Sequence, residues 1–416
     1  MNFFVQNQKE KESYIVLDEY RKEILDAIEK TKMATLFTFS ISNFKRLAIR
    51  KGFENTHISI MRVIKEMKKT FHGQAQLYQT DSSEYILLFP KRLVEPIEIG
   101  KQIHNLFAKQ LSSLVIDIGY AISEQSSNAE QLLNDSYMAM TMNNQSNAFA
   151  HGFTEQGKSN FSKQLVIENE LEKAINKGEL SVVYQPIVST NDLDFGFEAL
   201  VRWESGLLGN VPPLDFIHIA EKSGLILDVT TFVVETVLVQ LQEHPEIPYI
   251  NVNLSAALMD NSDWFDGLLE MIHKVYVSEA QRLSFEITEG IMLKEEHHVT
   301  IHKLRDLGHA VYIDDFGTGY SSMSYLIDSP FTGLKIDRDF INLLGTQYEP
   351  VVKNMISLAQ HLNLSVVAEG VETDSQLSSL KEMSCDFIQG YLEAAPLTRL
   401  EMNHYLLSKG EPASCS

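Results

Sequence analysis

The feature that most constrains the fold is a regular alternation of strand-like and helix-like segments in the second half of the chain. It begins at Glu179 and continues for about 235 residues, with short β-branched runs separated by longer segments of helical spacing. This alternation predicts an α/β barrel of the TIM type, with a doubly wound open sheet as the alternative. Eight strands are predicted, at Leu180–Val188, Phe195–Trp203, Tyr249–Leu254, Leu283–Ile287, Ala310–Ile313, Gly333–Ile336, Ser365–Ala368 and Asp386–Ile388.

The first half of the chain has a different order of elements. A charged helix is predicted within residues 1–30. Strands are predicted next at Leu36–Ile41, Ala75–Tyr78, Tyr85–Phe89 and Ser113–Ile122, and helices at His57–Phe71, Ile97–Gln110 and Ala129–Met142. This order predicts an α+β sheet domain over residues 31–155. The polar segment Asn147–Asn160 marks a boundary, and the barrel domain is predicted to span residues 156–411.

Composition limits the partners and the location of the protein. A net charge of −21 argues against a nucleic-acid polymer as partner, although it leaves room for a small phosphate ligand reached through metal ions. Cys385 and Cys415 are the two cysteines, which excludes a disulfide framework and a thiolate metal cluster. No apolar run approaches the roughly 18 residues that span a bilayer. We therefore expect a cytoplasmic location without a membrane segment, although a fragment of a membrane sensor would have the same composition.

Two adjacent acids, Asp314 and Asp315, follow the buried strand that ends at Ile313. Neighbouring carboxylates repel one another, so such a pair is costly unless cations neutralise it. One acid that bridges two ions beside one that holds the second ion would suit a two-metal hydrolytic site. The alternative is an acid pair that caps the helix after the turn.

Further polar residues lie at or near the ends of other predicted strands: Glu198, Asn253, Glu286, Glu289, Lys335, Asp337, Glu369, Glu372 and Gln389. The carboxyl ends of barrel strands meet at one mouth, where acids need cations as partners. Oxygen and amide ligands without Cys or His favour Mg²⁺ or Mn²⁺. Each residue alone has a structural alternative, such as a Glu198–Arg202 ion pair or a solvated Gln185, but together they indicate a metal site.

The second domain resembles the EAL family of phosphodiesterases, which linearise cyclic di-GMP. The resemblance covers about Phe161 to Lys409. It rests on the motifs Glu198-Ala199-Leu200, Asn253-Leu254-Ser255, Glu286-Ile287-Thr288-Glu289, Asp314 to Ser322, Ala368 to Thr373 and Gln389-Gly390-Tyr391. It implies hydrolysis of cyclic di-GMP to linear pGpG with two Mg²⁺ or Mn²⁺ ions. The alternative is a receptor that binds cyclic di-GMP without cleaving it and acts on a protein partner.

The resemblance also implies roles for individual residues. The implied metal ligands are Glu198, Asn253, Glu286, Asp314, Asp315 and Glu369. The implied catalytic residues are Lys335, Glu369, Gln389 and Glu289, of which Lys335 and Gln389 orient the attacking water and Glu289 braces the loop after Asp315. The implied substrate-binding residues are Gln185, Glu198, Leu200, Arg202, Asn253, Asp314, Lys335, Glu372 and Gln389. A homodimer through this domain is implied as well. Glu393 departs from the family pattern, and we expect this extra acid near the mouth to weaken substrate binding.

The first domain resembles a degenerate GGDEF domain, the fold of diguanylate cyclases. The signature turn reads Asp81-Ser82-Ser83-Glu84-Tyr85, so both glycines are missing, and Ser42 stands where the family has a metal-binding Asp. We therefore expect no cyclase activity. The domain is predicted to regulate or dimerise the second domain, with a vestigial packing role as the alternative.

Overall fold

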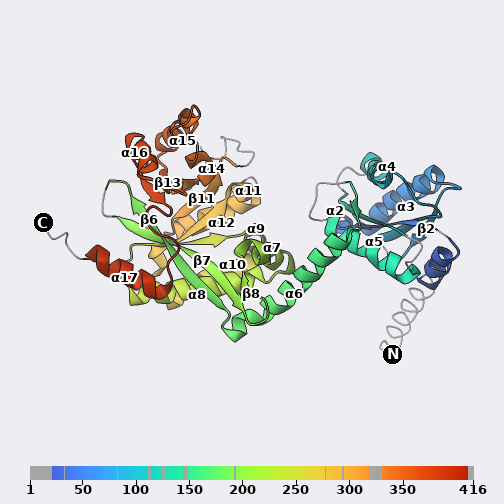
Figure 1. Cartoon of the computed structure of the whole chain (residues 1–416), viewed down its shortest axis with the longest axis horizontal. Helices are drawn as coiled ribbons and strands as arrows, with labels where there is room; N and C mark the ends of the chain where they lie inside the picture. The colour runs from blue at the N-terminus through green and yellow to red at the C-terminus, as the bar shows by residue number, and fades with distance from the viewer. Residues whose placement is uncertain are drawn as a thin grey trace. The chain divides into compact units, whose positions relative to one another are not determined.

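The computed structural model describes residues 21–410 apart from 32, 82, 111–113, 124–127, 144–148, 192–193, 277, 293–294, 319–325 and 327–329. The chain folds into two units that divide between Leu165 and Val166 (Figure 1). This division falls inside helix α6 (Glu155–Lys177). The boundary that the sequence predicted, at residue 156, lies near the start of the same helix.

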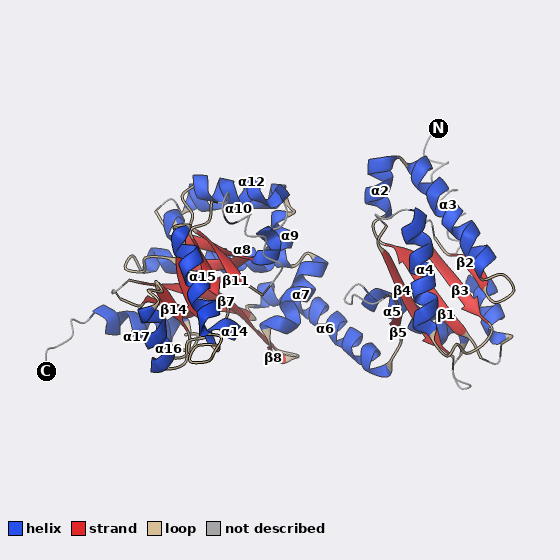
Figure 2. Cartoon of the chain, turned by 90° about the horizontal axis from the view of Figure 1, so that it is seen from above, coloured by secondary structure: helices blue, strands red, loops and turns tan. Residues whose placement is uncertain are grey.

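The first unit is a five-stranded sheet in the order β2-β3-β1-β4-β5, with helices on both faces (Figure 2). Its strands are β1 (Thr35–Ile41), β2 (Gln76–Gln79), β3 (Glu84–Phe89), β4 (Ile116–Ile122) and β5 (His151–Gly152), and its helices include α2 (Phe44–Lys51), α3 (Phe53–Thr70), α4 (Pro96–Gln110) and α5 (Ala129–Asn143). Successive side chains of a strand point to opposite faces of the sheet, so the first unit has one hydrophobic core on each face. Phe37 and Phe39 pack under α3 and α4, whereas Leu36 packs with α5 and with the helix at residues 21–29.

The second unit contains a closed ring of eight strands, as the alternation predicted. Around the ring the strands are β6 (Leu180–Ser189), β14 (Phe387–Gln389), β13 (Ser365–Glu369), β12 (Gly333–Ile336), β11 (Val311–Phe316), β10 (Leu283–Thr288), β9 (Ile250–Leu254) and β7 (Phe195–Ser205). The pairing of β6 with β7 closes the ring, which excludes the open-sheet alternative. A short strand, β8 (Gly209–Val211), extends β7 outside the ring.

Strand β6 runs antiparallel to both of its neighbours, whereas the other seven strands of the ring are parallel. The sequence predicted the eight strands but not this orientation. The connection between β6 and β7 is residues 190–194, which is too short for the crossover of a dozen or more residues that parallel neighbours require. The short connection therefore makes β6 and β7 an antiparallel hairpin.

Helices cover the outside of the ring, for example α8 and α15 (Figure 1). The α-helices described in full in the second unit after α6 are α7 (Pro213–Ser223), α8 (Ile226–Glu243), α9 (Ala256–Met259), α10 (Ser262–Val275), α11 (Glu289–Met292), α12 (Glu295–Asp306), α14 (Arg338–Ile341), α15 (Glu349–His361), α16 (Asp374–Glu382) and α17 (Arg399–Gly410). No single described helix has both the length and the apolar character to cross a membrane. The pair α7 and α8 passes that test only when joined, and it is bent by 119°.

Candidate active site

An irregularity in β11 gives the two adjacent acids their positions. In a regular strand, successive side chains point to opposite faces. In β11 the register with β12 shifts between Ile313 and Phe316, and Asp315 has a φ of 54°. This left-handed conformation is accessible to Asp at low cost because its short polar side chain can bond locally. The shift brings the carboxylates of Asp314 and Asp315 to the same place.

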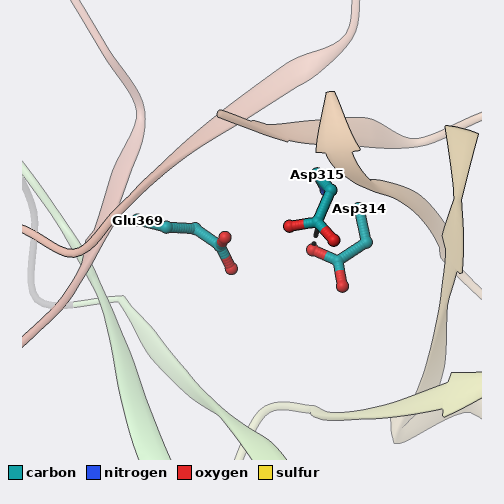
Figure 3. Close-up of side chains that lie close together, drawn as sticks. All are labelled: Asp314, Asp315 and Glu369. Carbon is teal, nitrogen blue, oxygen red and sulfur yellow. Dashed lines mark hydrogen bonds between the residues drawn. The ribbon is translucent and has the colours of Figure 1, made fainter. Parts of the chain in front are cut away.

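The carboxylate of Glu369, at the end of β13, faces this pair (Figure 3). Asp314, Asp315 and Glu369 each offer an oxygen, and these oxygens lie within 4.8 Å of one another. Three carboxylates at this spacing suit a hard divalent cation such as Mg²⁺ or Mn²⁺. They are three of the six metal ligands that the family resemblance implied.

Lys335 lies inside the barrel, in contact with two acids of this group, Asp314 and Glu369, and with two further acids, Glu198 and Glu286. Its side chain is 1% exposed, and its Nζ lies 3.0 Å from Glu198 Oε2, 2.9 Å from Glu286 Oε2, 3.5 Å from Asp314 Oδ1 and 2.6 Å from Glu369 Oε1. Four of the acids expected to bind metal ions therefore surround the lysine that is expected to orient the water. The structure brings the two sets into one cluster.

Burial and charge shift the pKa values in this cluster in opposite directions. Burial disfavours the charged form of Lys335, but the four acids outweigh this and hold its pKa well above the usual value. For Glu198, burial is opposed by Lys335 and by amide hydrogen bonds, so its pKa is lowered. Burial raises the pKa of Glu286 well above its usual value, and it raises the pKa of Glu369 to about 8. The pKa of Asp315 is also raised, by burial and then by Asp314. The positive charge of Lys335 alone therefore does not keep all of these acids ionised.

Amide side chains hold the acids in place. Asn253 Nδ2 donates to Glu198 Oε1 at 2.7 Å, and Gln389 Nε2 donates to Glu198 Oε2 at 2.7 Å. Asn251, which the sequence analysis missed, is fully buried and donates from Nδ2 to Glu286 Oε1 at 2.7 Å. Asn251 and Asn253 are two residues apart on β9 and so share a face. That spacing is the signal that would have identified Asn251.

Glu289, the first residue of α11, reaches the turn that follows the acid pair. Its Oε2 accepts a hydrogen bond of 3.0 Å from the backbone N–H of Gly317. A Cβ at Gly317 would lie 2.9 Å from Met355 and from Phe340, so the turn packs closely against its surroundings. This contact is consistent with the bracing role expected of Glu289. Residues 319–322 of the same motif lie outside the described residues.

Two cavities border the acid cluster and separate the predicted substrate-binding residues. A cavity of about 230 Å³, here called the mouth cavity, is lined by Gln185, Glu198, Leu200, Arg338, Glu369, Gly370, Glu372, Gln389, Gly390 and Tyr391. A second, more apolar cavity of about 500 Å³ is also bordered by Leu200, and its lining includes Arg202, Asn253 and Asp315. Arg202 therefore borders a different cavity from Glu372. Arg338 and Tyr391 line the mouth cavity but were not among the predicted substrate-binding residues.

Glu393 does not line the mouth cavity, contrary to expectation. Its Oε1 accepts a hydrogen bond of 2.6 Å from Tyr405 Oη and lies 3.1 Å from Lys409 Nζ, both on α17. These contacts compensate its charge and anchor the C-terminal helix. The position of Glu393 therefore gives no support to the expectation that it weakens substrate binding.

Comparison with known proteins identifies relatives of the second unit. Residues 168–396 match the EAL domain family. The cyclic di-GMP phosphodiesterase NbdA of Pseudomonas aeruginosa is 32% identical over 345 residues, which cover 80% of this chain and 42% of NbdA. This chain spans about half the length of the first curated relatives that it matches.

Solved structures extend the likeness to three dimensions. The PaMucR phosphodiesterase in complex with c-di-GMP is 34% identical, with a TM-score of 0.53, and the match covers 57% of this chain and 99% of that one. The S helix-GGDEF-EAL structure of Vibrio cholerae LapD matches 90% of this chain and 93% of its own with a TM-score of 0.54. At 18% identity, the likeness to LapD concerns the fold alone. Because residues 168–396 make up more than half of the sequence, the chain belongs to the EAL domain family.

Proposed function

We propose that this protein hydrolyses cyclic di-GMP to linear pGpG. The observation that carries the proposal is the cluster in which Lys335 contacts four carboxylates while Asp314, Asp315 and Glu369 come within 4.8 Å of one another. Members of the same family are named as cyclic di-GMP phosphodiesterases, and PaMucR forms a complex with c-di-GMP. The mouth cavity beside the cluster offers space for a ligand.

The donors in the cluster fit Mg²⁺ or Mn²⁺, because they are carboxylate and amide oxygens. Raised pKa values at Glu286, Glu369 and Asp315 also favour added positive charge there. We infer that Asp314, Asp315 and Glu369 hold one ion and that Glu198, Asn253, Glu286 and Asp314 hold the other. When bound, the two ions would supply Lewis acidity and neutralise charge on the phosphodiester.

The chain's own groups position the water that attacks phosphorus. Gln389 Oε1 is buried without a hydrogen-bond partner, so it can accept a hydrogen bond from this water. Lys335 supplies a fixed positive charge at the same cluster of oxygens. The oxygen of the water forms a bond to phosphorus, and the bond from phosphorus to the 3′ oxygen breaks. The 3′ oxygen then takes up the proton that the water gives up.

The test is incubation of the purified protein with cyclic di-GMP and Mg²⁺ or Mn²⁺, with the products separated by chromatography. We expect linear pGpG from the wild type and none from Glu198→Ala. Calcium should inhibit, because its larger and more flexible coordination suits an Mg²⁺ site poorly. Full hydrolysis by Glu198→Ala would remove this residue from the metal ligands.

The same experiment separates an enzyme from a receptor. A receptor would retain cyclic di-GMP in equilibrium dialysis without forming pGpG, in either metal ion. The full set of acids together with Lys335 favours the enzyme, since a receptor needs no activated water.

For the first unit we propose a regulatory role without cyclase activity. Ser42, at the position of a metal-binding Asp, donates its hydroxyl hydrogen bond to Asp117. We expect no cyclic di-GMP from GTP and Mg²⁺, and formation of the product would refute this part of the proposal.

We further propose a homodimer through the barrel unit and a regulatory protein partner. Sedimentation of the protein with and without residues 1–153 tests the dimer.

A further inference from the structure

One arginine on the wall of the mouth cavity has no role in the function proposed above. Arg338 is the first residue of α14, directly after β12 and the Asp337 cap. Its side chain is 56% exposed, and its Nη2 lies 2.9 Å from Glu372 Oε1. Both residues line the mouth cavity beside Glu198 and Glu369.

A glycine fixes the course of this side chain. Gly370 follows Glu369 with a φ of +65°, and a Cβ placed on it would lie 2.5 Å from Cγ, 2.7 Å from Cβ and 2.9 Å from Cδ of Arg338. The aliphatic part of Arg338 therefore lies directly over the backbone that carries Glu369. The aliphatic stem of Arg338 is thus held against Gly370, and the ion pair with Glu372 places the guanidinium on the wall of the mouth cavity.

The charges around the cavity give Arg338 a specific task. Three of the residues that line the mouth cavity are acids: Glu198, Glu369 and Glu372. Arg338 lines the same cavity, and its positively charged side chain is exposed to solvent. Lys335 lies deeper and is engaged by four carboxylates. A cyclic dinucleotide carries two negative phosphodiesters, which the partly exposed carboxylates of Glu369 and Glu372 would repel. An exposed guanidinium can attract such a ligand and bond a phosphate oxygen with two N–H groups.

We propose that Arg338 is a substrate-positioning residue, which binds a phosphate oxygen of the cyclic dinucleotide at the entrance of the mouth cavity. This inference rests on the proposed function. The interaction with Glu372 orients the guanidinium until the substrate arrives and leaves N–H groups available to it. Binding of this kind is the same in the ground state and the transition state, so it lowers KM and leaves kcat unchanged.

The test measures hydrolysis kinetics of the full-length protein with cyclic di-GMP and Mg²⁺. Arg338→Ala is expected to raise KM at least about tenfold, because it removes hydrogen bonds between charged groups, with kcat within about twofold of the wild type. Arg338→Lys should recover part of the loss, because it keeps the charge but not the planar fork. Arg399→Ala removes an exposed arginine that pairs with Glu243 on another part of the barrel, and it should leave KM unchanged.

A double-mutant cycle distinguishes direct contact from neutralisation of Glu372. If Arg338 contacts the substrate, Arg338→Ala still raises KM in the Glu372→Gln background, by a smaller factor than in the wild type because Glu372 no longer orients the guanidinium. If Arg338 only neutralises Glu372, the increase disappears in the Glu372→Gln background, and the proposal is overturned.

The possible failures are distinct. A wild-type protein that forms no pGpG refutes the proposed function. Hydrolysis by the wild type together with an unchanged KM in Arg338→Ala refutes only the role of Arg338. A fall in kcat with an unchanged KM would also contradict a positioning role. The dependence of kcat/KM on salt should be weaker in Arg338→Ala, since one attractive charge is gone.

Discussion

At the scale of single residues, the charge balance of the barrel interior depends on Lys335. The buried acids Glu198 and Glu286 lie within 3.0 Å of its ammonium group. Lys335→Met should lower the free energy of unfolding by about 3–5 kcal/mol in the presence of a chelator, because it leaves buried carboxylates without their cation. Urea unfolding measures this loss. The control is Lys303→Met, which removes an exposed lysine paired with Asp266 and should cost less than about 1 kcal/mol. Equal losses in the two variants would contradict the assigned charge balance.

The proton on Glu369 makes stability depend on pH. Burial raises the pKa of this carboxyl from 4.5 to about 8 in the folded state, against the opposing effect of Lys335. The folded protein therefore binds the proton more tightly than the unfolded chain does. The resulting stabilisation is fully present below pH 4.5 and is lost as the pH rises through about 8.

With a chelator present, we expect the free energy of unfolding to fall between pH 5.5 and pH 9, and to fall less in Glu369→Gln, where a neutral amide replaces the acid. Urea unfolding at the two pH values measures the difference between the proteins. An identical fall in both would show that Glu369 keeps an ordinary pKa. Metal binding should tighten over the same range, because the proton must leave before the ion binds.

At the scale of elements, the irregular end of β11 determines whether the acid pair can act together. Asp315 has a φ of 54°, where a β-branched residue is strained. Asp315→Asn should keep the stability of the protein, because Asn tolerates this conformation. Asp315→Val should destabilise it by about 1–2 kcal/mol. Both variants should lose affinity for Mg²⁺ in calorimetric titration. Wild-type affinity in Asp315→Asn would exclude this side chain as a ligand.

At the scale of the whole molecule, each unit has a core of its own. The barrel core includes Leu171 and Ala174 of α6, whereas the clusters of the first unit contain residues up to Phe153. A chain of residues 154–416, with α6 intact, should therefore unfold cooperatively by itself and hydrolyse cyclic di-GMP. Calorimetry and product chromatography test this. A shortened chain that starts at residue 178 should be less stable, because the core contacts of α6 are lost. Equal stability of the two chains would show that α6 does not belong to the barrel.

The sequence by itself predicted the eight strands of the barrel and the residues that we propose to carry the chemistry. The eight barrel strands follow from local patterns, since strand and helix periodicities are properties of neighbouring residues. The motifs that contain Glu198, Asp314 and Glu369 are equally local. The short connection after β6 also encodes its antiparallel orientation, because it leaves no room for a crossover.

Only the tertiary structure decided which of these residues meet. Ring closure between β6 and β7 and the register of parallel strands bring Lys335 to four acids that are far apart in the sequence. The fold also brings together Asn251 with Glu286, Arg338 with Glu372, and Glu393 with Lys409 of α17. These contacts depend on the order and register of strands around a closed barrel, and no local pattern in the chain encodes the distance between two strand ends.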